Sequence, residues 1–141
     1  MIVADVRARL AKKIRDRVEA LNTSGDLDVK VNVSDYVLTN PTGIFIQVFP
    51  GAANHNNAFQ RGHEQRDFII QLGAPLTSDI GAQKAIDALI SKQVIPTALD
   101  VKADDDPWDD INLDSDTGYT RFEKDGSAPL LGVEFTVRVY G

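Results

Sequence analysis

Hydrophobic positions in the first part of the chain recur at helical spacing. The stripe consists of Ile2, Val6, Leu10, Ile14, Val18 and Leu21, at steps of three and four residues. A second stripe follows a Thr77 or Ser78 cap and consists of Ala82, Ala85, Ile86, Leu89 and Ile90. These patterns predict two amphipathic helices, over residues 2–21 and 78–93, with Pro96 ending the second at the latest.

Extended segments have the shorter period expected of strands. They cover residues 29–33, 44–49, 63–72, 119–123 and 130–140. The last is the clearest, because Val133, Phe135, Val137 and Val139 alternate with polar or half-polar residues. The run 44–49 is apolar on both faces except at Gln47, which is typical of a central strand.

Together these elements predict an α+β fold, a mostly antiparallel sheet of about five strands with two helices packed on one face. Two helices cannot cover both faces, and Phe45, Phe49 and Ile69 fall on the side away from their apolar neighbours. Exposed apolar surface of this kind is typical of an interface, so we expect an oligomer. The alternative is that the loop 94–117 folds over this face with Trp108, Ile111 and Leu113.

Length, composition and net charge narrow the range of domain organisations and partners. The 141 residues suit a single domain over 1–141, with loops 50–62 and 94–117 projecting. Apolar and charged fractions of 43% and 26% are those of ordinary globular proteins. No apolar run approaches the ~20 residues needed to cross a bilayer, so we expect no membrane partner and synthesis in the cytoplasm. The net charge of −6 argues against sequence-specific nucleic-acid binding.

Charge is segregated along the chain. Residues 7–17 hold six basic side chains against Asp16 alone, and residues 100–116 hold eight acidic side chains against Lys102 alone. The simpler interpretation is a solvated helix face and a mobile loop. The alternative is that neighbouring copies use the two segments to orient each other.

Catalytic and metal motifs are weak. His55 and His63 match no common metal spacing, and the chain has no cysteine, nucleophile elbow or phosphate loop. A calcium-loop spacing from Asn112 to Glu123 has Thr117 where glycine is needed. We therefore expect no enzyme activity and no cofactor, and keep a divalent-metal module in the acidic loop as a minor alternative.

The order and length of the elements resemble the tail terminator, or tail completion, proteins of long-tailed bacteriophages over residues 2–140. The ending is the most specific part, with Gly118 to Gly126 (GYTRFEKDG) followed by Leu131 to Tyr140 (LGVEFTVRVY). The resemblance implies a structural subunit of a hexameric ring that caps the tail tube, stops its polymerisation and joins it to the head. It also implies a virion location and partners in the tube and neck proteins. A head-side neck or completion protein remains the alternative.

Within such a ring, DNA would pass through the lumen without sequence-specific binding, and acidic lining would repel phosphate. Candidate subunit-interface residues are Arg7, Lys13, Arg17, Phe45, Phe49, Ile69, Arg138 and Tyr140. Candidate lumen or tube-facing residues are Asn54, His55, Phe59, Arg61, Asp104, Asp105, Asp106, Asp109 and Asp110.

Overall fold

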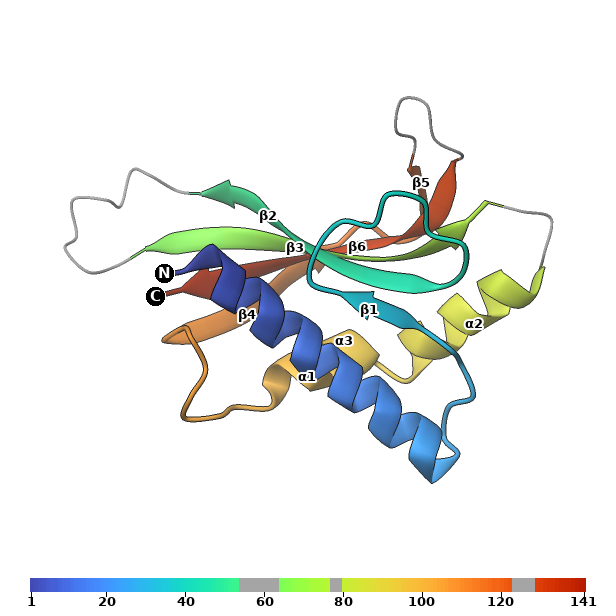
Figure 1. Cartoon of the computed structure of the whole chain (residues 1–141), viewed down its shortest axis with the longest axis horizontal. Helices are drawn as coiled ribbons and strands as arrows, with labels where there is room; N and C mark the ends of the chain where they lie inside the picture. Colours follow the sequence, from blue (N-terminus) through green and yellow to red (C-terminus); the bar gives the residue numbers. More distant parts are fainter. Residues whose placement is uncertain (54–63, 77–79, 123–128) are drawn as a thin grey trace.

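The computed structural model describes residues 1–53, 64–76, 80–122 and 129–141. Within them the chain forms helices and strands in an α+β arrangement (Figure 1), which confirms the predicted fold class. The helices are α1 (Val3–Ser24), α2 (Ile80–Ser91) and α3 (Val94–Asp100). The strands are β1 (Asn32–Ser34), β2 (Phe45–Ala53), β3 (Gln65–Pro75), β4 (Asp110–Asp116), β5 (Thr120–Phe122) and β6 (Leu130–Tyr140).

The strands form a single mostly antiparallel sheet in the order β1-β2-β3-β6-β4, and β5 pairs with β6 beyond the end of β4. Only the β1–β2 pair is parallel among the described strands. The segments 44–49 and 63–72, both predicted to be extended, contribute β2 and β3, which pair in an antiparallel ladder. Strand β6 lies between β3 and β4, so the alternating C-terminal segment is an interior strand.

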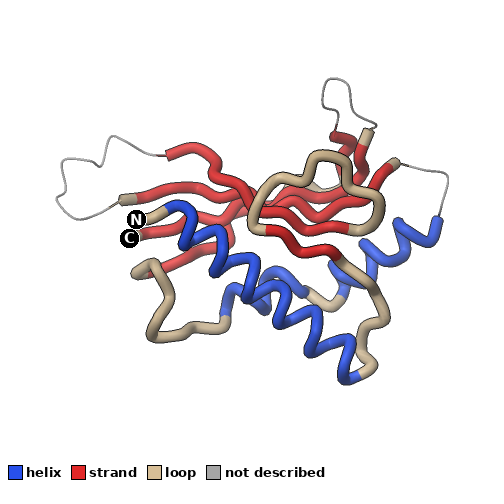
Figure 2. The backbone as a smooth tube through the Cα atoms, in the orientation of Figure 1, coloured by secondary structure: helices blue, strands red, loops and turns tan. Residues whose placement is uncertain are grey.

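All three helices lie on the same side of the sheet (Figure 2). The α1 stripe is buried there because its period brings every apolar residue to one face, and Gly25 ends the helix with a left-handed φ of 83°. The sheet contributes the residues of alternating strand positions. The shared core contains Val6, Leu10, Ile14, Ile46, Val48, Phe68, Ile70, Leu72, Ile86, Leu89, Val133, Phe135, Val137 and Val139.

The segment 94–117 corrects the expectation of a projecting loop, since it contains α3 and β4. Pro96 lies in the first turn of α3, where a missing backbone N–H costs no helical hydrogen bond. Trp108, Ile111 and Leu113 pack against the helix-side core. The alternative that these three side chains cover the opposite face is therefore wrong.

The predicted loop 50–62 also begins later than expected. Residues 50–53 belong to β2, where a register irregularity falls between Pro50 and Ala53. Residues 54–62 lie outside the described residues.

On the face away from the helices, Phe45 packs over Gly73. A Cβ at Gly73 would lie 3.1 Å from the Phe45 ring, so the missing side chain leaves room for the ring. Gly132 opposes Gly73 in the β3–β6 ladder, and a Cβ there would lie 2.0 Å from the carbonyl oxygen of Leu72. Phe45 is 1% exposed, which corrects its assignment to a subunit interface.

Residues 35–43, here called the flap, connect β1 to β2 and arch beside this second face (Figure 1). Arg7 Nε donates to the carbonyl oxygen of Asp35 at 2.6 Å, and its guanidinium lies 4.1 Å from the centre of the Tyr36 ring. The backbone N–H of Leu38 donates to Gln47 Oε1 at 2.9 Å. The flap is thus held by α1 on one side and by β2 on the other.

Candidate functional site

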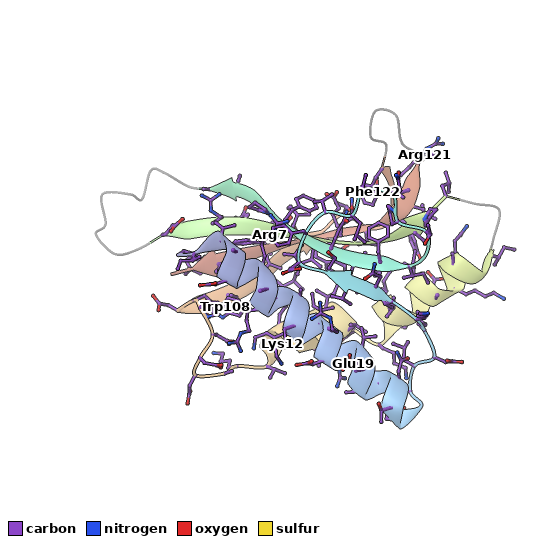
Figure 3. The ribbon with its side chains drawn as sticks, in the orientation of Figure 1. Arg7, Lys12, Glu19, Trp108, Arg121 and Phe122 are labelled. Carbon is purple, nitrogen blue, oxygen red and sulfur yellow. The ribbon has the colours of Figure 1, made fainter. Side chains whose placement is uncertain are left out.

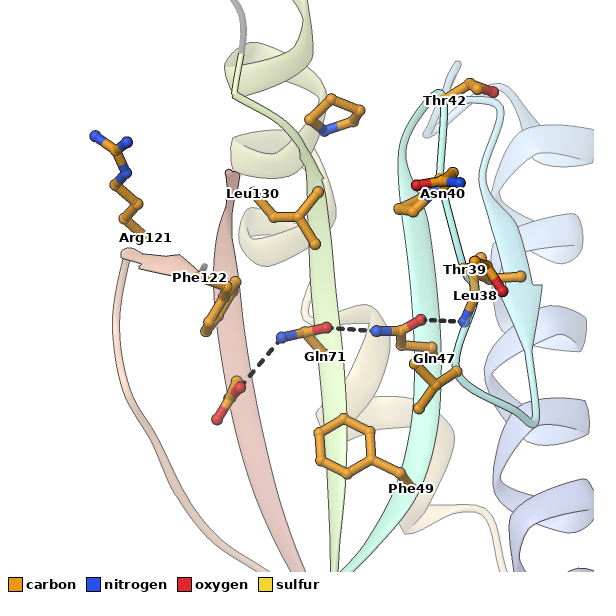
Figure 4. Close-up of a pocket in the computed structure, with 14 residues that line it drawn as sticks. Leu38, Thr39, Asn40, Thr42, Gln47, Phe49, Gln71, Arg121, Phe122 and Leu130 are labelled. Atoms are coloured by element: carbon orange, nitrogen blue, oxygen red, sulfur yellow. Dashed lines mark hydrogen bonds between the residues drawn. The ribbon is translucent and has the colours of Figure 1, made fainter. Parts of the chain in front are cut away.

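A groove of about 690 Å³ lies on the second face of the sheet. Its floor comes from β2, β3 and β6, one wall from the flap, and the other from β5 (Figure 4). The lining residues are Val37, Leu38, Thr39, Asn40, Pro41, Thr42, Gln47, Phe49, Gln71, Pro75, Arg121, Phe122, Leu130 and Glu134. This volume falls within the range typical of ligand sites.

A ladder of polar side chains crosses the floor. Gln47, Gln71 and Glu134 are direct neighbours on three adjacent strands, because they pair in register. Gln47 Nε2 donates to Gln71 Oε1, and Gln71 Nε2 donates to Glu134 Oε1 at 3.1 Å. With the Leu38 bond to Gln47, every donor points toward the carboxylate (Figure 4).

The two glutamines of the ladder are buried, and the ladder uses only part of their hydrogen-bonding capacity. Gln47 is 4% exposed and Gln71 is 7% exposed, yet each amide nitrogen spends one of its two hydrogens in the ladder. Glu134 Oε2 has no hydrogen bond or ion pair with the residues that the structure describes. The floor therefore offers spare donors and an unpaired carboxylate oxygen between apolar walls.

The other charged residue of the lining, Arg121, does not neutralise this carboxylate. Its side chain extends away from the ladder (Figure 4), and it is engaged in another interaction. The described lining contains no histidine, serine or lysine. The described lining thus combines apolar walls with a few polar groups, which is the usual make-up of a binding site.

The basic residues of α1 are mostly engaged within the chain. Figure 3 shows Arg7, Lys12 and Glu19 spread along α1, with Trp108 near the N-terminal half of the helix. Lys13 Nζ donates to the carbonyl oxygen of Val101 at 2.6 Å and lies 3.2 Å from Asp106 Oδ1. Arg17 is half-buried, and its Nε lacks a hydrogen bond.

Arg9 completes this internal pairing. Its guanidinium donates to Asp105 Oδ2 at 2.9 Å and lies 3.7 Å from Asp106 Oδ1. The hydrogen bond to Asp105 raises the pKa of Arg9, and the same bond lowers the pKa of the Asp105 carboxyl. Arg9 and Lys13 of the basic helix are therefore paired with Asp105 and Asp106 of the acidic segment within one chain, which argues against the use of these four residues as complementary surfaces between copies.

The remaining interface candidates occupy the sheet. Phe49 and Ile69 are paired neighbours on the second face and are half-buried. Arg138 Nε donates to Asp67 Oδ1 at 3.2 Å, and Arg138 also lies 3.8 Å from Asp114. Tyr140, at the end of β6, is 36% exposed. Phe49, Ile69 and Tyr140 thus remain accessible in part, whereas Arg138 is engaged.

The structure separates the candidate lumen residues into two groups. Asp104, Asp109 and Asp110 are exposed, and Asp110 begins β4. Asp105 is exposed too but is paired with Arg9, and Asp106 is half-buried and paired with Lys13. The other candidates, Asn54, His55, Phe59 and Arg61, lie outside the described residues.

The calcium-loop spacing falls on strands, because Asn112, Asp114 and Asp116 belong to β4 and Thr120 to β5. An EF-hand would require a helix after the loop. Across the described ranges, no three or more histidine or acidic side chains gather as a metal site would need.

The pKa of Tyr119 is raised, first because the phenol is partly buried and second because it donates a hydrogen bond to Asp87. This hydrogen bond connects the residue before β5 to α2.

The sequence matches no protein family model, and no curated protein resembles it significantly. Within the described part of the chain, no helix has the length and apolar character required to cross a bilayer.

Sequence reasoning missed the ladder as a site. Gln47 stood out as the single polar residue of an apolar run, and Gln71 and Glu134 occupy the same kind of position in their own strands. The signal was present, but period-two alternation does not give the register that brings three strands together.

Proposed function

We propose that the chain is a structural subunit of a ring that caps a bacteriophage tail tube and joins it to the head, with six copies as the family resemblance implies. In this proposal the protein is not an enzyme, and its place is the head-proximal end of the tail in the virion. The support comes from the order of its elements and from the second face of its sheet.

The observation that carries the proposal is the one-sided cover of the sheet. Three helices bury one face, while the other keeps the groove and the half-buried pair Phe49 and Ile69. On the adjoining flap, Tyr36 is 52% exposed and Val37 is 48% exposed. Exposed apolar groups concentrated beside a groove are typical of a surface that another chain covers.

Charge has a smaller role in this proposal than the sequence indicated. Because Arg9 and Lys13 are paired internally, contacts between copies would depend mainly on apolar surface from the second face. Asp104, Asp109 and Asp110 remain exposed and would suit a lumen, where their charge would repel passing DNA.

The test is the mass and shape of the assembly. Light scattering after gel filtration, followed by electron microscopy, is expected to show a closed ring, formed alone or after addition of the tail tube protein of the same phage. Binding to the tube protein, compared with the neck connector, separates the tail side from the head side. A chain that stays monomeric with both partners at high concentration would contradict the proposal.

A matched pair of variants locates the contact. Val37→Asp places a charge on the exposed flap and is expected to abolish ring formation while leaving the melting temperature within about 2 °C, since exposed substitutions change stability little. Val101→Asp is the control, because Val101 is also exposed but lies on the helix side. Equal assembly by both variants would exclude the flap from the contact.

A further inference from the structure

The groove has a polar feature that a plain apolar contact surface would not need. The buried amides of Gln47 and Gln71 lie in one row with the half-buried carboxylate of Glu134, and each group keeps hydrogen-bonding capacity that the ladder does not use. The unpaired Oε2 of Glu134 carries negative charge at a half-buried position. A carboxylate in such a place is stabilised by a cation that arrives with a ligand.

The side chains of the groove walls indicate which groups should flank the cation of the ligand. Phe122 and Leu130 stand on the β5 side and Phe49 at one end of the floor (Figure 4), so a cationic group at Glu134 would be bordered by apolar side chains. An aromatic ring near the carboxylate also favours a cation over a neutral group. The opposite wall is the flap, whose Leu38 N–H is already used by Gln47.

From these contacts we infer that the groove binds an extended segment of a partner protein, with a lysine or arginine side chain at Glu134 and apolar residues on either side. The partner's basic group would donate to Glu134 Oε2, and its neighbouring carbonyl oxygens would accept from the spare hydrogens of Gln47 and Gln71. Charge complementarity selects this occupant, because the described lining has no other charge directed at the ladder. A neighbouring copy and such a segment would compete for the same face of the sheet, so a second copy found in the groove would overturn this inference and leave the ring proposal standing.

The probe is an acetylated, amidated pentapeptide with a central lysine between valines, titrated into the ¹⁵N-labelled full chain. We expect saturable shifts of the side-chain amide signals of Gln47 and Gln71 and of the backbone signals of the flap. A peptide with norleucine in place of lysine is expected to bind at least tenfold more weakly, about 1.4 kcal/mol. Shifts confined to other parts of the chain, or equal affinity for the two peptides, would overturn the inference.

Glu134→Gln is the decisive variant, because a glutamine at this position can still accept from Gln71 while losing the charge. We expect it to bind the lysine peptide at least tenfold more weakly and the norleucine peptide unchanged. Glu19→Gln, an exposed change on α1, is the matched control and should bind like the wild type. If Glu134→Gln fails to fold, the two peptides on the wild-type chain still decide the question.

Two other occupants are outcomes of the same experiment. Butylammonium binding as tightly as the lysine peptide would show that the site takes a free amine, which contradicts a protein segment. The same Gln47 and Gln71 shifts appearing on concentration of the chain alone would mean that a second copy fills the groove. Either result overturns the inference.

Discussion

Replacing Lys13 by methionine tests the internal pairing of α1 with the acidic segment. The Lys13 side chain is 9% exposed and that of Asp106 is 7% exposed, so their contact is almost fully shielded from water. Methionine keeps the apolar stem but removes the charge, the hydrogen bond to the carbonyl oxygen of Val101 and the cation near the Trp108 ring. Asp106 would then keep Arg9, at 3.7 Å, and the hydrogen bond that its Oδ2 accepts from the backbone N–H of Ala103 at 3.1 Å.

The expected loss of folding stability is large because the Asp106 carboxylate would remain in a place shielded from water without its Lys13 partner. Breaking a buried pair by removing one partner costs about 3–5 kcal/mol, and the remaining contact with Arg9 places Lys13→Met at the low end, about 3 kcal/mol. At about 3 °C per kcal/mol for a chain of this size, the melting temperature should fall by about 9 °C. Lys12→Met is the matched control, since the Lys12 side chain is 62% exposed and its bond to Asp16 is worth about 0.3–0.5 kcal/mol.

Urea unfolding measures both variants by two signals. Trp108 is the single tryptophan of the chain and lies beside Lys13, so its fluorescence reports the local contact, while circular dichroism reports the whole fold. If Lys13→Met and Lys12→Met differ by less than about 0.5 kcal/mol, the spread expected for surface changes, the shielded pair contributes nothing and the reasoning fails.

Gly132→Ala should lower the free energy of unfolding by about 3 kcal/mol or more, because its Cβ would lie 2.0 Å from a backbone oxygen that cannot rotate away. Gly43→Ala, which meets nothing within 4 Å, should be neutral or slightly stabilising in the same thermal melts, and similar losses in both would argue against the close approach of β3 and β6. A third prediction concerns pH: since Arg9 lowers the pKa of Asp105, their pairing stabilises the fold above the ordinary value of 3.8 and is lost as the pH falls through the lowered value. The stability difference between wild type and Arg9→Gln should therefore be present near neutral pH and shrink in acid, and a difference that grew in acid would contradict it.

The strongest periodic signals located most of the fold. The stripe of α1 and the alternation of β6 were both predicted to within a few residues, because each buries one face and its period follows directly from backbone geometry. The segment 94–117 was missed, since its many aspartates hid the short buried set of Val94, Ile95, Ala98 and Leu99. A run of like charges is a poor guide to whether a segment is a solvated loop when residues of opposite charge elsewhere in the chain pair with it.

The candidate site shows the same limit. Phe45 was correctly assigned to the face away from the helices, yet its burial depends on Gly73, which lies in the neighbouring strand. The flap, the groove and the ladder likewise combine segments far apart in the sequence. No pattern within one strand contains the register between strands.

The sequence by itself determined that the strongly periodic segments, such as 2–21 and 130–140, are helical or extended and which side of each faces a core, because those properties are periodic and local. Only the tertiary structure decided that Lys13 meets Asp106 and that Gln47, Gln71 and Glu134 form one row. Such pairings depend on strand register and helix placement, which arise from the packing of the whole chain.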